Sequence, residues 1–263
     1  MPSPAARRTS QSGRVPVSEH ALMLVLASMK RLVWGDKAVR DGTGWAERSK
    51  LSLVELEGST VGIIGIGFLG SEIARKLKYG FRCHVLGYDP YADPRLTCLA
   101  DVEMVPDLYD LLGHSQVLIL APALTDETRN MIGAPELAAL PRGANVINVG
   151  RGQVLDLDAL AAALDSGQVL AAGLDVFYPE RRPNGHPLLS NPKVTLTPHI
   201  GGITAEASSQ LAHLPPSSHR MPEREDAEVC GESGSVDRVG LSAAGVSGAC
   251  MISDAHSRTR LSG

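Results

Sequence analysis

The chain has 263 residues, of which 43% are hydrophobic, and is therefore long enough to bury the core of one large domain or of two ordinary ones. Its formal net charge of −4 argues against nucleic acid or an anionic membrane as the main partner. The four cysteines show neither metal-type nor redox-pair spacing, so we expect a protein of the reducing cytoplasm that binds no metal.

The first segment of the chain has no hydrophobic period. Residues 1–17 are rich in Ser, Pro and Arg, which predicts an irregular leader. Because residues 1–14 contain three arginines and no acidic residue, organelle targeting stays open as an alternative to the cytoplasm. The longest apolar run that follows, residues 21–27, is much too short to span a bilayer.

An apolar helix is predicted over residues 18–32, with Ser18 as its N-cap and Glu19 in its first turn. Its hydrophobic residues are almost continuous, so the helix should be buried on most sides, against its own domain or against a second copy of the chain. We therefore expect a homodimer. This helix and the residues after it define a linking helix and connector over residues 18–48.

A dinucleotide-binding fingerprint opens the next segment, residues 49–211. The β-branched run over residues 60–66 is typical of a buried parallel strand, and it passes into the glycine-rich turn Gly65-Ile-Gly-Phe-Leu-Gly70. In such a turn the first glycine permits a tight bend, the second lets backbone amides approach a pyrophosphate, and the third allows a helix to pack closely on the strand. A helix over residues 71–79 follows, and its N-terminus attracts phosphate.

An acidic residue ends the second predicted strand. The strand over residues 83–88 is followed by Asp89, nineteen residues after Gly70. At that position a carboxylate accepts hydrogen bonds from an adenosine ribose and repels a 2′-phosphate. No basic residue lies between Asp89 and Arg95, so the sequence predicts NAD rather than NADP. The glycine motif alone also fits an ordinary tight turn, but the strand, helix and terminal aspartate around it favour a cofactor site.

Strands and helices continue to alternate along the chain. Further strands are predicted at residues 117–121, 144–149, 171–176 and 193–197. Between two of them, a helix over residues 157–165 has Asp156 as its N-cap and Gly167 as its stop. This alternation predicts an α/β fold, a Rossmann-type doubly wound parallel sheet, whose ligands bind at the carboxyl ends of the strands.

Charged or titratable side chains follow three of these strands. Arg151, Glu180 and His199 should therefore converge on one edge of the sheet, although they are far apart in the sequence. An arginine fork binds a planar carboxylate, and a glutamate beside an imidazole raises its pKa and orients the ring. Taken singly, a surface charge, a member of a polar run and a strand-end histidine need no function. Their order behind a dinucleotide fingerprint favours redox chemistry on a carboxylate-bearing substrate.

At these residues the sequence resembles the D-isomer-specific 2-hydroxyacid dehydrogenase family. The segments that carry the resemblance are Gly65-Ile-Gly-Phe-Leu-Gly, Asn148-Val-Gly-Arg-Gly, Leu174-Asp-Val-Phe-Tyr-Pro-Glu and Thr197-Pro-His-Ile-Gly-Gly, and it extends over residues 17–211. It implies NAD(H)-dependent interconversion of a 2-keto acid and a D-2-hydroxy acid. In such an enzyme Arg151 binds the substrate carboxylate and carbonyl, His199 protonates the carbonyl oxygen as hydride arrives, and Glu180 is the partner of His199.

The same resemblance implies which residues bind the cofactor. They belong to the glycine loop, the end of the second strand, the loop beside the adenine and ribose, and the ends of the later strands. These residues are Gly65, Gly67, Phe68, Leu69, Gly70, Asp89, Pro122, Thr125, Val149, Gly150, Arg151, Asp175, His199, Gly201 and Gly202. Among them, Asp175 is expected at the nicotinamide amide.

Two departures from the family leave a second function open. In the family a substrate domain precedes the helix equivalent to residues 18–32, so we expect much of the substrate lid to be absent. Residues 213–263 contain no Phe, Trp, Tyr or Lys and are rich in Ser and Gly, which predicts a disordered tail over residues 212–263. The alternative is a non-catalytic NAD(H)-binding, dimerising module, similar to the corepressors of the same superfamily, or an inactive homologue.

Overall fold

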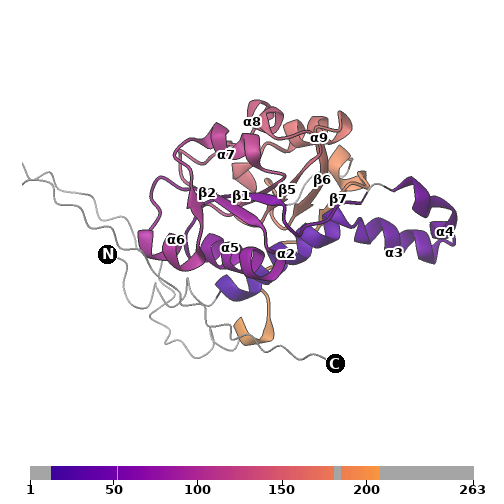
Figure 1. Ribbon diagram of the computed structural model, residues 1–263. Coiled ribbons are helices and arrows are strands. Elements are labelled where there is room, and N and C mark those ends of the chain that lie inside the picture. Colours follow the sequence, from indigo (N-terminus) through magenta and orange to yellow (C-terminus); the bar gives the residue numbers. More distant parts are fainter. Residues whose placement is uncertain (1–12, 52, 181–184, 208–263) are drawn as a thin grey trace, which may run out of the picture. The chain divides into compact units, whose positions relative to one another are not determined.

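The computed structural model describes residues 13–51, 53–180 and 185–207 (Figure 1). The predicted tail over residues 212–263 and the leader before residue 13 lie outside this part of the chain. Within it, seven strands form one sheet in the order β3-β2-β1-β4-β5-β6-β7, and every pair of neighbours is parallel. The predicted α/β fold, a doubly wound parallel sheet, is confirmed.

The strands are short, and those in the middle of the sheet are buried. Their bounds are β1 Thr60–Ile64, β2 His84–Tyr88, β3 Glu103–Met104, β4 Val117–Leu120, β5 Ala144–Asn148, β6 Val169–Leu174 and β7 Val194–Leu196. Every residue of β4 and of β5 is buried, as expected for strands covered on both faces. The chain leaves β1 toward β2 on one side and returns to β4 on the other, so the strand order reverses between β1 and β4.

Two apolar clusters fill the space between the sheet and its helices. One cluster joins side chains of the sheet to α7 (Leu108–His114), α8 (Ala134–Ala139) and α9 (Leu157–Asp165). The other joins them to α2 (Arg14–Met29), α5 (Phe68–Phe81) and α6 (Pro94–Ala100). Figure 1 shows these two sets of helices on opposite faces of the sheet. The carboxyl ends of the strands, between the two layers, are thus left to the loops.

Helix α2 differs from its prediction at both ends. It begins at Arg14, with Gly13 at the N-cap, and not at Ser18. Pro16 fits into the first helical turn because the backbone N–H that proline lacks has no acceptor there. Ser18 is a buried residue inside the helix whose hydroxyl donates to the Val15 carbonyl, so its predicted capping role is wrong. The helix ends at Met29, and the left-handed residue Arg31 separates it from α3.

For other helices, capping residues and glycines in the sequence predicted the ends to within a few residues. Helix α9 begins after Asp156, whose carboxylate accepts from the amides of Asp158 and Ala159, and the positive φ of Gly167 follows its end. Helix α5 starts three residues before the predicted Ser71, directly after Gly67. The two-residue strand β3 was not predicted, since two residues carry no readable alternation.

The remaining helices are short. They are α3 (Leu32–Arg40), α4 (Gly44–Glu47), α10 (Pro187–Ser190) and two 3₁₀ turns at Arg48–Lys50 and Gly152–Val154. Aspartates Asp93 and Asp107 cap α6 and α7 through their side chains, as Asp156 caps α9. In the described part of the chain, no helix has the length and apolar character needed to cross a membrane.

Candidate functional site

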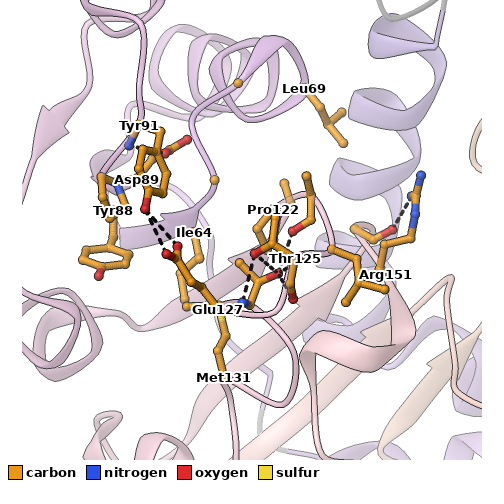
Figure 2. A pocket seen from close by; sticks show the side chains of 18 of the residues that line it. Ile64, Leu69, Tyr88, Asp89, Tyr91, Pro122, Thr125, Glu127, Met131 and Arg151 are labelled. Atoms are coloured by element: carbon orange, nitrogen blue, oxygen red, sulfur yellow. Dashed lines mark hydrogen bonds between the residues drawn. The ribbon is translucent and has the colours of Figure 1, made fainter. Parts of the chain in front are cut away.

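A cavity of about 800 Å³ lies at the carboxyl ends of β1, β2, β4 and β5, where the strand order reverses (Figure 2). Open parallel sheets bind their ligands at such a switch point. Most of the residues that the sequence predicts for cofactor binding line this cavity. They are Gly65, Gly67, Phe68, Leu69, Asp89, Pro122, Thr125, Val149, Gly150 and Arg151.

The glycine loop has the geometry that each predicted role requires. Gly65 has a φ of +89°, and a Cβ there would lie 2.6 Å from the Cα of Pro122. A Cβ on Gly70 would lie 2.0 Å from the Gly65 carbonyl oxygen, so only glycine allows α5 to pack this closely on the loop. By contrast, a Cβ on Gly67 would meet nothing within 4 Å. The loop is therefore closed toward the protein and open on the cavity side, where a pyrophosphate can approach the N-terminus of α5.

The Asp89 carboxylate is fixed by two backbone amides. Its Oδ2 accepts from the Ile66 N–H at 2.9 Å, and its Oδ1 accepts from the Tyr91 N–H at 2.9 Å. One of these amides belongs to the glycine loop and the other to the loop after β2. The carboxylate is thus held in position on the cavity wall before any ligand binds, as a ribose acceptor should be.

Two cavity residues were missed by sequence reasoning. The Tyr91 hydroxyl donates to both carboxylate oxygens of Glu127 at 3.0 Å, which links the loop after β2 to the loop after β4 across the cavity (Figure 2). This hydrogen bond raises the pKa of Tyr91. The only sequence signal was proximity, since each residue lies two positions after a predicted site residue, Asp89 or Thr125. Glu127 thus adds a second carboxylate to the lining of the cavity.

Arg151 lies on the turn that follows β5. Its Nη1 donates to the Gly150 carbonyl at 2.7 Å, and in Figure 2 its guanidinium lies on the far side of Pro122 and Thr125 from Asp89. The turn is held by buried Asn148, whose amide nitrogen donates to the Arg151 carbonyl while its amide oxygen accepts from the Gly150 N–H. Sequence reasoning noted Asn148 only as part of a motif. Its side chain is what sets the backbone of the arginine.

His199 and Glu180 form a solvent-exposed pair after β7 and β6. The imidazole Nδ1 lies 3.3 Å from Glu180 Oε1, and the side chains are 51% and 77% exposed. His199 itself has a φ of 56°, a left-handed conformation that costs a non-glycine residue about 1–2 kcal/mol. The predicted partnership of the two residues is thus present in the geometry, on an unusual stretch of backbone.

Asp175, after β6, holds the backbone of this loop. Its buried carboxylate accepts from the Thr197 hydroxyl at 2.6 Å, from the Ile200 N–H at 3.0 Å and from the Gly201 N–H at 2.9 Å. Burial alone would raise the pKa of Asp175, but the hydrogen bonds from Thr197, Gly201 and Ile200 outweigh it and lower the pKa. Asp175 is therefore an ionised carboxylate whose two oxygens accept hydrogen bonds from the loop after β7.

The predicted residues thus form two groups. Asp175, His199, Gly201 and Gly202 lie at the ends of β6 and β7 and do not line the cavity, and Gly70 lies beneath the glycine loop. The turn after β5 joins the two groups, because a Cβ on Gly152 would lie 2.1 Å from the Phe177 backbone after β6. Among the described residues, no cluster of His, Cys, Asp and Glu is suited to holding a metal ion.

Comparison with known proteins agrees with this geometry. Residues 22–201 match the family model described as "D-isomer specific 2-hydroxyacid dehydrogenase, NAD binding domain". A D-3-phosphoglycerate dehydrogenase of Archaeoglobus fulgidus is 36% identical over 200 residues, which cover 76% of this chain and 37% of that protein. A glyoxylate reductase of Pyrococcus furiosus is 40% identical over 202 residues, which cover 75% of this chain and 59% of that protein.

Solved structures give the same result. The apo form of D-mandelate dehydrogenase from Rhodotorula graminis superposes with a TM-score of 0.74 and 31% sequence identity, and the match covers 78% of this chain and 61% of that one. The chain therefore spans between about a third and about three fifths of the length of these relatives.

Proposed function

The chain belongs to the D-isomer-specific 2-hydroxyacid dehydrogenase family and contains its NAD-binding domain, and from this premise we propose that it is an NAD-dependent oxidoreductase. The reaction is the interconversion of a 2-keto acid and a D-2-hydroxy acid. The observation that carries the proposal is the exposed His199–Glu180 pair, whose Nδ1 to Oε1 distance is 3.3 Å, at strand ends that adjoin the cofactor cavity.

The residues of the cavity fit the cofactor. The open face of Gly67 and the N-terminus of α5 would hold the pyrophosphate, because the first amides of a helix carry no internal partners. The fixed carboxylate of Asp89 would accept from the ribose hydroxyls, and Pro122 and Thr125 would hold the adenosine. Gly150 and the loops after β6 and β7 would hold the nicotinamide end. When bound, the cofactor supplies or accepts the hydride.

Arg151 and His199 supply the charge and the proton. The guanidinium of Arg151 binds the substrate carboxylate as a fork and polarises the neighbouring carbonyl. As the carbonyl carbon gains a hydride, its oxygen takes a proton from the His199 imidazolium, which becomes neutral. Glu180 lies 3.3 Å from Nδ1 and orients the ring. Because half of the His199 side chain is exposed, water returns the proton for the next turnover.

Oxidation of NADH by the full chain with a panel of 2-keto acids tests this proposal. Glyoxylate, hydroxypyruvate, pyruvate and phenylglyoxylate span small, polar and aromatic side chains. We expect turnover of at least one acid and formation of the D-hydroxy acid, which chiral chromatography of the product identifies. Turnover of none, alongside tight NADH binding, would leave the non-catalytic function.

The second candidate is a non-catalytic NAD(H)-binding, dimerising module. The exposure of His199 and Glu180 favours it, since dehydrogenase chemistry gains from excluding water around the reacting atoms. Such a module binds NADH with the same preference over NADPH, but it reduces no keto acid. Parallel titration and turnover measurements on one preparation therefore separate the two functions.

We further propose that the chain forms a homodimer through its α2–α4 region. Leu32, Val33, Val39 and Trp45 are exposed on α3 and α4, and Trp45 is 74% exposed. A cluster of large apolar side chains of this kind is typical of an interface, and a second copy presents the same surface in a symmetric dimer. Sedimentation should give a dimer that Val39→Asp dissociates, whereas Leu99→Asp on α6 serves as the exposed control.

A cytoplasmic location is proposed on the state of the cysteines. Cys83 is buried and Cys98 is exposed, and both are free thiols. Burial raises the pKa of the Cys83 thiol to about 11, so it stays protonated and unreactive. Free thiols of this kind suit a reducing compartment. Fractionation of cells that express the chain tests this location against organelle targeting.

A further inference from the structure

A half-buried histidine on α2, His20, contacts the loop that carries His199. The Nε2 atom of His20 lies 2.9 Å from the Thr197 hydroxyl oxygen and 3.2 Å from Asp175 Oδ1. The side chains of His20 and Asp175 are only 13% and 3% exposed. Neither the glycine fingerprint nor the Arg151–Glu180–His199 set includes His20, and sequence reasoning treated its helix only as a packing and dimerisation element.

The direction of the hydrogen bonds follows from the proton count. The Thr197 hydroxyl has one proton, which it donates to Asp175 Oδ1 at 2.6 Å. The Thr197 hydroxyl oxygen must therefore accept a hydrogen bond from His20, so Nε2 of His20 carries the hydrogen. This N–H faces both the hydroxyl oxygen and the carboxylate of Asp175. His20 is thus the donor that fixes the rotamers of Thr197 and Asp175 together.

Asp175 in turn holds the strained backbone at His199. Its main-chain oxygen accepts from the His199 N–H at 2.8 Å, and its carboxylate accepts from the amides of Ile200 and Gly201. These three consecutive amides keep His199 at its φ of 56°. A rotation of the Asp175 side chain would release two of them, and the loop would relax toward an ordinary backbone conformation.

The imidazole also packs directly on the loop. A Cβ on Gly201 would lie 2.9 Å from Asp175 Oδ2 and 3.3 Å from the Cγ and Cδ2 atoms of His20. The ring therefore packs against the Cα of Gly201, and it can approach this closely because glycine has no side chain. His20 contacts the loop through a hydrogen bond at one end and van der Waals packing at the other.

We propose that His20 is a positioning residue that acts through Asp175 and Thr197 to hold the His199 loop in the conformation that receives the nicotinamide end of the cofactor. The inference rests on the proposed function, since it assumes that the cofactor spans from Asp89 to this loop. It gives α2 a role in the reaction besides its burial. The ADP-ribose half of the cofactor would be held by the residues that line the cavity, none of which belongs to α2.

Binding of NADH and of ADP-ribose to the full chain, measured by calorimetry, tests the proposal. Loss of a buried hydrogen bond to a charged group predicts that His20→Ala weakens NADH binding by about ten-fold or more. Binding of ADP-ribose, which lacks the nicotinamide, should stay within about two-fold of wild type, because the adenosine wall is intact. His20→Gln, whose amide places an N–H at a similar reach, should recover most of the NADH affinity. If His20 had only a structural role, His20→Ala would weaken the binding of NADH and of ADP-ribose alike.

Ser18→Ala serves as the matched control, because Ser18 is buried on the same helix and its hydroxyl donates to the Val15 carbonyl, away from the loop. Ser18→Ala should change the melting temperature, but it should leave the ratio of the NADH affinity to the ADP-ribose affinity as in wild type. Thr197→Val, which removes the acceptor of the His20 hydrogen bond, should reproduce the selective loss. The proposal is overturned if wild type binds NADH more tightly than ADP-ribose and both His20→Ala and Thr197→Val keep that difference. Wild type that binds the two equally would instead refute the proposed position of the cofactor, and the inference with it.

Discussion

The two ends of the site are built from different parts of the chain. At the cofactor cavity the decisive atoms are backbone: the open face at Gly67, the close approach of Gly65 to Pro122, and the two amides that hold Asp89. At the ends of β6 and β7 the decisive atoms are side chains. There, the buried carboxylate of Asp175 accepts hydrogen bonds from the loop after β7 and lies 3.2 Å from His20 of α2.

This difference shows where each end is rigid and where it is open to change. The cavity wall is fixed by main-chain geometry, so a side-chain substitution alters selectivity more than shape. The His199 loop exposes the imidazole to solvent and depends on the buried carboxylate of Asp175 for its conformation. The most informative substitutions are therefore those that affect either the cavity or the His199 loop, but not both.

The largest effect is expected where the backbone leaves no room. Gly70→Ala places a methyl group 2.0 Å from the Gly65 carbonyl oxygen, which cannot move aside without opening the loop. Overpacking of this kind should cost about 3 kcal/mol in the free energy of unfolding, measured by urea denaturation, and should abolish NADH binding. Gly80→Ala, in the same helix with nothing within 4 Å, is the control and should lose no stability.

A second substitution acts on the chemistry and not on binding. Glu180→Gln removes the carboxylate that lies 3.3 Å from Nδ1 of His199, so kcat should fall by about ten-fold or more. The affinity for NADH should stay unchanged, since Glu180 does not line the cavity. Steady-state kinetics beside NADH titration measure both. Equal losses in kcat and in the affinity for NADH would contradict the assignment of binding to the cavity and of chemistry to the His199 loop.

A third substitution acts on cofactor choice. Asp89→Ala removes the carboxylate that accepts from the ribose and repels a 2′-phosphate, so the preference for NADH over NADPH should narrow several-fold. Glu127→Gln, which keeps an acceptor for Tyr91 and removes the second charge, should narrow it less. Fluorescence titration with both cofactors gives the ratio. A wild-type preference for NADPH would refute the assignment of Asp89.

The smallest effect concerns acid stability. Because the folded state lowers the pKa of Asp175 below 3.8, its ionised form stabilises the fold at pH values above the unfolded pKa. That contribution is lost as pH falls through the lowered pKa. As pH falls below 3.8, wild type should therefore lose stability more steeply than Asp175→Asn, as chemical denaturation at a series of pH values would measure. Parallel slopes would show that the carboxylate is not held as described.

The sequence predicted the cavity end better than the loop end, for a physical reason. The glycine motif and Asp89 lie on consecutive elements, so their spacing already implies the turn, the helix N-terminus and the ribose acceptor. The contact between His20 and Thr197 joins residues 177 positions apart, and no local pattern encodes it. The start of α2 was mispredicted because the Ser, Pro and Arg content of residues 1–17 was taken as a sign of irregular structure, although a first helical turn accommodates Pro16.

The central claim is that His199 transfers a proton as the cofactor's hydride reduces a 2-keto acid. A single-turnover measurement tests it most directly: the chain in excess over NADH is mixed with a saturating keto acid, and the absorbance of reduced nicotinamide is followed. Wild type should oxidise the bound NADH, and His199→Ala should do so slower by about 10²-fold or more, at protein concentrations at which both proteins bind all of the NADH. Equal rates for the two proteins, or no oxidation by wild type that binds NADH, would contradict the claim.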